Sequence, residues 1–128
     1  MGDRRRIPAL SSFEADIGFT RALRTGDRIL VSGTTAILPD GSIPEDAGAQ
    51  ADHIFREIIG HVETLGGRSD DIVRIRMFVT DIADAEAVSA AFSRALKHAL
   101  PTATLVAIAA LFDPRLKVEI EAEAIVSE

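Results

Sequence analysis

The C-terminal stretch alternates strictly between apolar and charged residues, and no other feature constrains the fold as strongly. From Leu116 onward every second residue is apolar, up to Val126, and most of the residues between them are charged. A period of two over this length predicts a β-strand with one buried face. The other face carries Glu119, Glu121 and Glu123. These carboxylates either form a solvated or ion-paired surface or include one with a catalytic role.

The rest of the chain predicts further strands and two helices. Residues 101–111 predict a strand joined to the C-terminal one by a turn at 112–115. Upstream, the sequence predicts an arm or edge segment at 1–16, a hairpin over 19–35 with a turn at 25–27, a helix from 45–46 to 66–67, a strand over 71–80 and a helix from Asp84 to just before Pro101. The order β-β-α-β-α-β-β predicts an α/β (α+β) fold, with one sheet and two helices on one face, as a single domain over residues 1–128.

Two helices cover only one face of such a sheet, so the other face is expected to be open. The strand over 71–80 has an apolar side for the core and a side that bears two arginines and a phenylalanine. The core side is Val73, Ile75, Met77 and Val79, and the open side is Arg74, Arg76 and Phe78. The segment 104–110 is apolar on both sides and requires cover on both. The sequence therefore predicts self-association through the open sheet face.

The arginines of the open face allow two interpretations. Arg74 and Arg76 can pair across strands with the glutamates, which neutralises like charges on a sheet face. Alternatively, Arg76, or Arg21 in the first hairpin, anchors an anion, because a guanidinium group matches a carboxylate with two parallel hydrogen bonds. The sequence leaves both interpretations open.

Composition and charge narrow the classes of function. The chain carries a formal charge of -6 and has no Tyr or Trp, which argues against the basic surface and stacking platform of nucleic-acid-binding proteins. It has no Cys, and His53, His61 and His98 lack the spacing of helical metal ligands. The sequence shows no cofactor motif, secretory signal or membrane-spanning stretch. We therefore expect a cytoplasmic protein without a metal, a cofactor, nucleic-acid partners or membrane partners.

Six segments, spread in order over nearly the whole chain, resemble one protein family. They are G-D-R-I-L-V-S-G-T (26–34), P-D-G-S-I-P (39–44), A-Q-A-D-H-I-F-R-E-I (49–58), D-D-I-V-R-I-R-M-F-V-T-D-I-A-D (70–84), L-P-T-A-T-L-V (100–106) and V-E-I-E-A (118–122). In these segments the chain is similar to the Rid family, also called YjgF-like and often labelled endoribonuclease L-PSP. The resemblance implies a chorismate-mutase-like α/β fold and a homotrimer, with sheets packed into a central barrel and three clefts between subunits. The best-known activity of the family is hydrolysis of enamines and imines, such as 2-aminoacrylate, to 2-oxo acids and ammonia.

The resemblance also implies site residues. Glu119 corresponds to the glutamate that positions the attacking water. Gly33 corresponds to a strand glycine beside a backbone carbonyl that lines the cleft. Phe19 stands where the family has a tyrosine, and Ser89 stands where it has an asparagine in the second helix. These residues are expected to surround a small-molecule ligand, a carboxylate or a carbonyl compound.

Ala103 is the departure from the family that matters most for the substrate. It stands where the family has the arginine that pairs with the substrate carboxylate, and Leu105 on the same strand is expected to line the same cleft. Charge-assisted hydrogen bonds contribute about 1.5–3 kcal/mol each, so loss of a bidentate pair weakens binding by about 10²-fold or more. We therefore expect a substrate that depends less on its carboxylate than 2-aminoacrylate does, or one that is held by Arg21 or Arg76.

Two classes of function remain. The first is a Rid-like hydrolase of a small imine, enamine or related carbonyl derivative, in which Glu119 and a water act in an intersubunit cleft. The second is a non-catalytic trimer that binds a small ligand or has a regulatory role, where Glu119 is one member of an acidic sheet face. Cleavage of RNA rests on the family label alone and conflicts with the acidic charge and the missing stacking residues.

Overall fold

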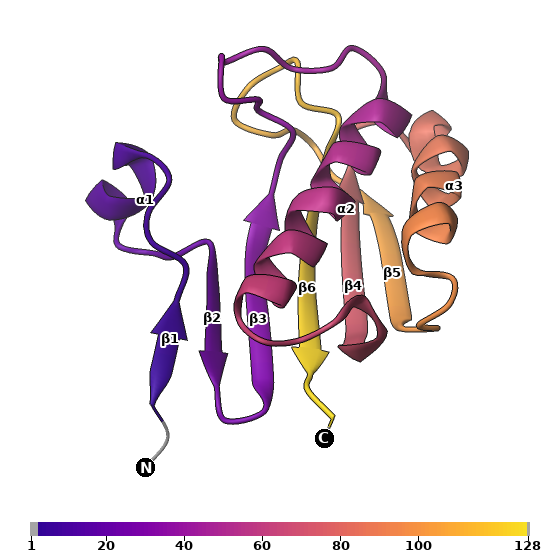
Figure 1. The fold of residues 1–128 in the computed structure, drawn as a ribbon. Helices are drawn as coiled ribbons and strands as arrows, with labels where there is room; N and C mark the ends of the chain where they lie inside the picture. The colour runs from indigo at the N-terminus through magenta and orange to yellow at the C-terminus, as the bar shows by residue number, and fades with distance from the viewer. Residues whose placement is uncertain (1–2, 128) are drawn as a thin grey trace.

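The computed structural model describes residues 3–127 and contains one six-stranded sheet with two long helices on one face (Figure 1). In chain order the strands and α-helices are β1 (Arg4–Arg6), α1 (Ser12–Ile17), β2 (Ala22–Thr25), β3 (Arg28–Thr34), α2 (Ala47–Thr64), β4 (Ile72–Val79), α3 (Ala85–Leu96), β5 (Thr102–Ala107) and β6 (Val118–Ile125). Two short 3-10 turns, Ser69–Asp71 and Ile82–Asp84, precede β4 and α3. The predicted fold class is confirmed.

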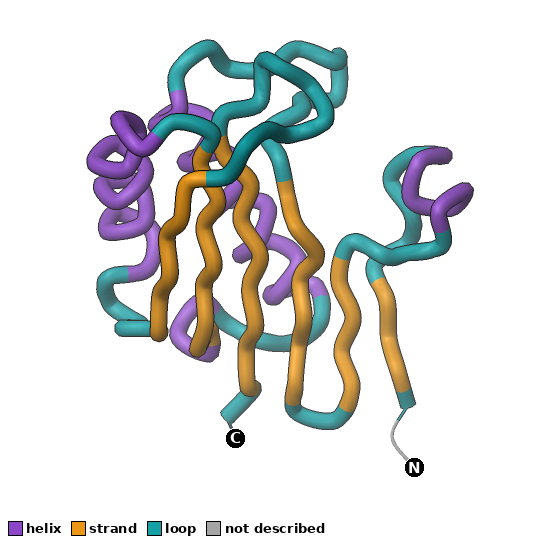
Figure 2. The backbone as a smooth tube through the Cα atoms, turned by 180° about the vertical axis from the view of Figure 1, so that it is seen from behind, coloured by secondary structure: helices purple, strands orange, loops and turns teal. Residues whose placement is uncertain are grey.

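The sheet has the strand order β1-β2-β3-β6-β4-β5, and every neighbouring pair is antiparallel except β4 and β5. α2 and α3 pack against one face. Seen from behind, the strands are not covered by any of these helices (Figure 2). α1 lies at the β1 end of the sheet, away from α2 and α3 (Figure 1). The open face that the helix count predicts is therefore present.

The connection between the last two strands differs from the prediction. β4 lies between β5 and β6, so these two strands do not pair, and the loop 108–117 joins them instead of a turn at 112–115. β6 begins at Val118 rather than at Leu116. A parallel pair such as β4 and β5 requires a crossover connection, which α3 provides. This arrangement leaves β5 at the sheet edge with most of its residues exposed.

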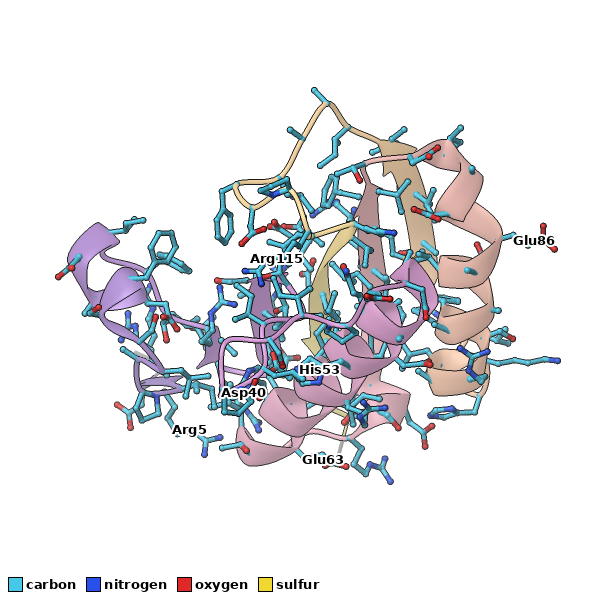
Figure 3. The ribbon with its side chains drawn as sticks, turned by 90° about the horizontal axis from the view of Figure 1, so that it is seen from above. Arg5, Asp40, His53, Glu63, Glu86 and Arg115 are labelled. Atoms are coloured by element: carbon cyan, nitrogen blue, oxygen red, sulfur yellow. The ribbon has the colours of Figure 1, made fainter. Side chains whose placement is uncertain are left out.

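The longest helix, α2, forms where the sequence predicts it. Asp46 caps its N-terminus by accepting a hydrogen bond from a backbone N–H of the first turn at 2.7 Å. Gly66 follows the helix with a φ of 91°, a conformation that favours glycine. Arg5, on the α2 side of the sheet in Figure 3, and Arg24 donate to Leu65 O at 3.1 and 2.8 Å, which places two cations at the helix C-terminus. The predicted apolar stripe is buried throughout: Ala51, Ile54, Phe55, Ile58, Val62 and Leu65.

A β-bulge in β4 changes one predicted core position. Ile72 pairs with Ala124 and Arg74 pairs with Glu123, so Val73 has no partner of its own in β6. Val73 is 37% exposed and Ile72 is buried, so the placement of Val73 in the core was wrong. Beyond the bulge the predicted alternation holds, with three buried residues: Ile75, Met77 and Val79.

The N-terminal segment, expected to be an arm or an edge segment, contains an edge strand and a short helix that was not predicted. β1 pairs with β2, and Ile7 N donates to Ala22 O at 3.0 Å beyond the end of the strand. A helix as short as α1 is difficult to detect because one and a half turns show little 3.6-residue periodicity. Its Glu14 is 5% exposed and accepts hydrogen bonds from Leu10 N at 3.3 Å and from Ser11 Oγ.

Gln50 holds the loop that leads into β6. Its side chain is fully buried, donates to Pro44 O at 2.8 Å and to Arg115 O at 2.9 Å, and accepts from Lys117 N at 2.9 Å. Both of its N–H groups and its carbonyl oxygen therefore have partners, as a buried amide requires. These bonds fix the backbone immediately before the strand that carries the three glutamates.

Candidate functional site

Two of the three glutamates of β6 are paired with arginines across the sheet. The register places Arg76 opposite Glu121 and Arg74 opposite Glu123. Arg76 Nη1 lies 2.9 Å from Glu121 Oε1, and Arg74 Nε lies 3.6 Å from Glu123 Oε1. Arg28 on β3 contacts Glu123 as well. Cross-strand neutralisation, the first interpretation of these arginines, is therefore present, and Arg76 is occupied by Glu121.

Glu119 differs from its two neighbours. The register places it opposite Phe78, and within residues 3–127 its carboxylate has no hydrogen bond or ion pair. Partial burial raises the pKa of Glu119; the charge of Arg21 opposes this shift, and the charge of Glu121 adds to it. A half-buried carboxyl group with a raised pKa and no cation partner is suited to act as a general base.

Gly33 lies directly against the Glu119 carboxylate. The register between β3 and β6 shifts between Val31 and Thr34, so Ser32 and Gly33 form a β-bulge, a feature that is frequent next to active sites. A Cβ at position 33 would overlap Glu119 Oε2 and lie 3.0 Å from Glu119 Cδ. The glycine therefore leaves the space that the carboxylate occupies.

Arg21 connects Gly33 to the N-terminal segment. Its Nη2 donates to Gly33 O at 3.0 Å, and its Nε lies 3.5 Å from Glu14 Oε1. The guanidinium carbon lies 5.2 Å from the centroid of the Phe19 ring. Burial acts to raise the pKa of Glu14, but hydrogen bonds from Ser11 and the backbone, together with the charge of Arg21, lower it overall. Arg21 is thus held by a carboxylate, a carbonyl oxygen and an aromatic ring.

Three phenylalanines form an aromatic cluster next to Arg21. Phe13 contacts Phe19 edge-on with ring centroids 6.0 Å apart, and it stacks on Phe112 at 5.9 Å. Phe13 is 51% exposed and Phe112 is 69% exposed, so the cluster presents an apolar surface. Sequence reasoning missed Phe13 and Phe112, which lie on α1 and on the loop 108–117, because residues this distant in the chain share no periodic pattern.

An open groove of about 510 Å³ lies on the bare sheet face between β1 and β3. A smaller hollow of about 90 Å³ lies over the paired arginines and glutamates. Glu119 lines neither of these two hollows. The groove is lined by Arg6, Gly18, Phe19, Thr20, Leu23 and Ser32.

The site residues expected from the sequence fall into two groups. Those near the β3–β6 pair come together: Phe19, Arg21, Gly33 and Glu119. The others lie toward the opposite edge of the sheet. Ser89 is exposed on α3, Ala103 is exposed on β5 across from Ile75, and Leu105 is half-buried across from Met77. Because β4 separates β5 from β6, one chain does not assemble the complete set.

Neither a cluster of metal-ligand side chains nor a membrane-spanning helix is present in residues 3–127. Between residues 3 and 127 no three His, Asp or Glu side chains lie close enough together to hold a metal ion. No helix in the same range is long and apolar enough to cross a bilayer.

Comparison with known proteins identifies the family. The family model described as Endoribonuclease L-PSP matches residues 9–126. The crystal structure of Rv2704 from Mycobacterium tuberculosis, a member of the YjgF/YER057c/UK114 family, superposes with a TM-score of 0.88 at 34% identity and covers 97% of this chain and 100% of that chain. This chain belongs to the Rid/YjgF family.

Two further proteins that this chain resembles have a reaction or a bound ligand stated in their names. The 2-iminobutanoate/2-iminopropanoate deaminase of Escherichia coli strain K12 is 32% identical over 123 residues, which cover 91% of this chain and 94% of the deaminase. The crystal structure of E. coli TdcF with bound serine has a TM-score of 0.79 at 26% identity and covers 85% of this chain and 88% of that chain. The family expected from the sequence motifs is thereby confirmed.

Proposed function

We propose that this Rid/YjgF protein hydrolyses a small imine or enamine, or a related carbonyl derivative, to a carbonyl compound and ammonia. The proposal rests mainly on the environment of the Glu119 side chain. This half-buried carboxyl group has a raised pKa, has no partner within residues 3–127 and lies against the backbone of Gly33. The relative that is 32% identical and named as an imine deaminase supports the reaction class.

In the proposed mechanism Glu119 acts first as a general base and then as a general acid. It accepts a proton from a water whose oxygen attacks the iminium carbon, which gives a neutral carbinolamine. It then passes this proton to the nitrogen, the C–N bond breaks with its electron pair leaving on ammonia, and the hydroxyl proton returns to Glu119, from which ammonia removes it. A raised pKa brings the carboxyl group closer to neutral pH, which suits both transfers.

The proposed site requires more than one copy of the chain. We propose a homotrimer in which the bare sheet faces pack inward and the β5 edge of each copy, together with α3, meets the region around Glu119 of the next copy. This places Ser89, Ala103 and Leu105 next to the catalytic group. Leu30 and Val106 are each 42% exposed, which is consistent with a face that is covered in an assembly. Sedimentation should give three times the chain mass of 13.7 kDa, and a monodisperse monomer would contradict the proposed site.

The substrate is proposed to differ from 2-aminoacrylate. Ala103 offers no cation, and the two arginines expected to replace the missing one are engaged by protein groups. Arg76 is paired with Glu121, and Arg21 is held by Glu14 and by the carbonyl oxygen of Gly33. A carboxylate placed on the imine carbon itself therefore lacks an evident anchor.

A panel of imines generated in situ, with ammonia release as the readout, tests the proposal. Glu119→Gln should lower the rate by about 10²–10⁴-fold, the usual contribution of a general acid–base group. Glu123→Gln is a matched control on the same strand and face, and it should retain activity because that carboxylate serves Arg28 and Arg74. If Glu119→Gln is as active as wild type on every substrate found, the assigned role is wrong.

The alternative is a non-catalytic trimer that binds a small ligand. It is favoured by the alanine at position 103 and by the ion pairs of Glu121 and Glu123, which make Glu119 one member of an acidic sheet face. A thermal-shift screen with small metabolites separates the two functions, since ligands that stabilise the protein strongly but are never converted indicate binding alone. Strong, salt-sensitive binding of RNA would instead support the activity for which the family model is named.

A further inference from the structure

Most cations of the bare sheet face are paired with acidic side chains. Arg28 and Arg74 contact Glu123, Arg76 contacts Glu121, and Arg21 contacts Glu14. Arg4 and Arg6 on β1 differ, because within residues 3–127 neither has an acidic partner. Of these two, only Arg6 lines the open groove.

Strand alternation places the Arg6 side chain on the bare face. Its neighbour Arg5 lies on the α2 side of the sheet, where it donates to Leu65 O (Figure 3). Successive side chains of a strand point to opposite faces, so Arg4 and Arg6 share the face of the groove. Arg6 is exposed and its guanidinium group is not committed to any hydrogen bond among the described residues. It is therefore a cation at the β1 end of a hollow.

The other walls of the groove supply apolar surface and hydrogen-bond acceptors. Phe19 and Leu23 are apolar. Thr20 Oγ1 donates to Ile7 O at 2.7 Å, and Ser32 Oγ donates to Thr20 O at 2.7 Å. Because both hydroxyl protons are used, the two oxygens offer lone pairs to the groove rather than donors. Ser32 precedes the glycine that contacts Glu119, so this end of the groove leads toward the proposed catalytic carboxyl group.

We propose that Arg6 binds the carboxylate of an extended, largely apolar substrate whose imine lies at the Ser32 end of the groove. The inference rests on the proposed function for the position of the imine near Glu119. Neighbouring strands are about 4.8 Å apart, so β1 and β3 are separated by about 10 Å. The carboxylate is therefore several bonds away from the C=N carbon, unlike that of a 2-imino acid, and the imine N–H faces the hydroxyl oxygens of Thr20 and Ser32.

The single guanidinium group favours a monoanion. One cation balances the charge of a carboxylate, whereas a phosphate monoester keeps an uncompensated negative charge next to apolar surface. A remote carboxylate anchor also accounts for the alanine at position 103, because such a substrate does not require a cation beside the imine carbon.

Calorimetric titration of the intact protein with 7-oxooctanoate tests the inference without any turnover. This compound is a stable product analogue, and 2-heptanone is its neutral counterpart without the carboxylate. Arg6→Gln should weaken binding of 7-oxooctanoate by about 10-fold or more, the effect of losing a charge-assisted pair, and should leave 2-heptanone unchanged. Arg4→Gln, on the same strand and face but outside the groove, should bind both compounds as wild type does.

Several results would overturn the inference. They are wild-type protein that does not bind 7-oxooctanoate, equal binding by Arg6→Gln and wild type, an equal loss in Arg4→Gln, and tighter binding of heptyl phosphate than of the carboxylate. Glu119→Gln should bind 7-oxooctanoate normally. Binding that depends on Arg6 in a protein that converts no imine would refute the proposed function and leave the carboxylate site at Arg6 intact. Imine hydrolysis that does not depend on Arg6 would support the proposed function and refute the carboxylate site.

Discussion

Replacing Gly33 with alanine should disrupt the candidate site, because the added methyl group meets Glu119. A Cβ at this position overlaps Glu119 Oε2 and lies 3.0 Å from Glu119 Cδ, which is closer than the optimal separation of about 3.5–4.0 Å between carbon atoms. Gly33 is not among the glycines with positive φ, so its backbone accepts alanine and the conflict is purely steric. Glu119 must leave its position, and imine hydrolysis should fall about as far as in Glu119→Gln.

The stability cost of Gly33→Ala depends on how easily the carboxylate moves. Overpacking costs about 1–3 kcal/mol in well-packed sites. Glu119 is only half-buried and is not hydrogen-bonded within the described residues, so we expect a value near about 1 kcal/mol in urea denaturation. Gly60→Ala is the control. This glycine lies in α2 with nothing within 4 Å of an added Cβ, so alanine should stabilise the protein by about 0.5–1 kcal/mol.

A double-mutant cycle tests whether Glu119 causes the loss. Gly33→Ala combined with Glu119→Ala removes the atoms that overlap, so the double variant should regain the stability lost in Gly33→Ala. The coupling energy should be about 1 kcal/mol, within the range found for residues in contact. A coupling energy of zero, or a Gly33→Ala variant with wild-type activity, would refute the packing of Glu119 against Gly33.

Three further predictions concern pH and buried polar groups. Burial raises the pKa of Glu119, so kcat/KM should increase as the pH rises through that pKa, and Glu119→Gln should lack this increase. The stability that the neutral form of Glu119 contributes is present below the unfolded-state pKa and is lost as the pH rises through the folded-state pKa. Burial acts to raise the pKa of Asp71, but hydrogen bonds from Arg68 N and Ser127 lower this pKa overall. The stability that Asp71 contributes is therefore present above the unfolded-state pKa and is lost as the pH falls through the folded-state pKa. In acid, the free energy of unfolding of Asp71→Asn should vary less with pH than that of wild type. Gln50→Leu leaves two carbonyl oxygens and one N–H without partners, at a cost of about 3 kcal/mol or more, which a lowered Tm should show.

Local periodicity correctly predicted the helices and strands that pack one apolar face against the core. The stripe of α2 and the alternation of β6 both follow from one apolar face packed on one core, so neither requires knowledge of a distant partner. The same patterns placed Arg76 and Glu121 on one face, and their ion pair confirms that interpretation. The prediction that Val73 is buried was wrong, because a bulge shifts the alternation by one residue and periodicity alone does not indicate bulges.

Sequence periodicity does not predict contacts between segments that are far apart in the chain. The position of β4 between β5 and β6 depends on the crossover through α3, and the turn expected at 112–115 is part of a longer loop. That loop brings Phe112 onto Phe13, and the β1–β2 pairing brings Arg6 into one groove with Ser32. Each of these contacts joins residues that are far apart in the chain, so each follows from the tertiary fold rather than from a local pattern.

The register between β4 and β6 decides which glutamate is left without a cation. Alternation places all three glutamates on the face of the arginines, but a slip of two residues would preserve that face and put Arg76 opposite Glu119. In the structure Arg76 is opposite Glu121, and Phe78 is opposite Glu119. Two hydrogen bonds of the Lys117 backbone stabilise this register. Its O accepts from Thr80 N at 3.1 Å, and its N donates to the buried side chain of Gln50 at 2.9 Å.

Gln50 therefore has a role beyond the stability of its own loop. By fixing Lys117 it helps to hold the register in which Glu119 has no cation across the strand. Partial burial raises the pKa of Glu119, and a cation placed opposite it would lower that pKa. In Gln50→Leu the pH at which kcat/KM rises should shift downward if the register relaxes toward the pairing of Arg76 with Glu119. An unchanged pH profile in a folded Gln50→Leu protein would show that the core packing of β6 fixes the register without this amide.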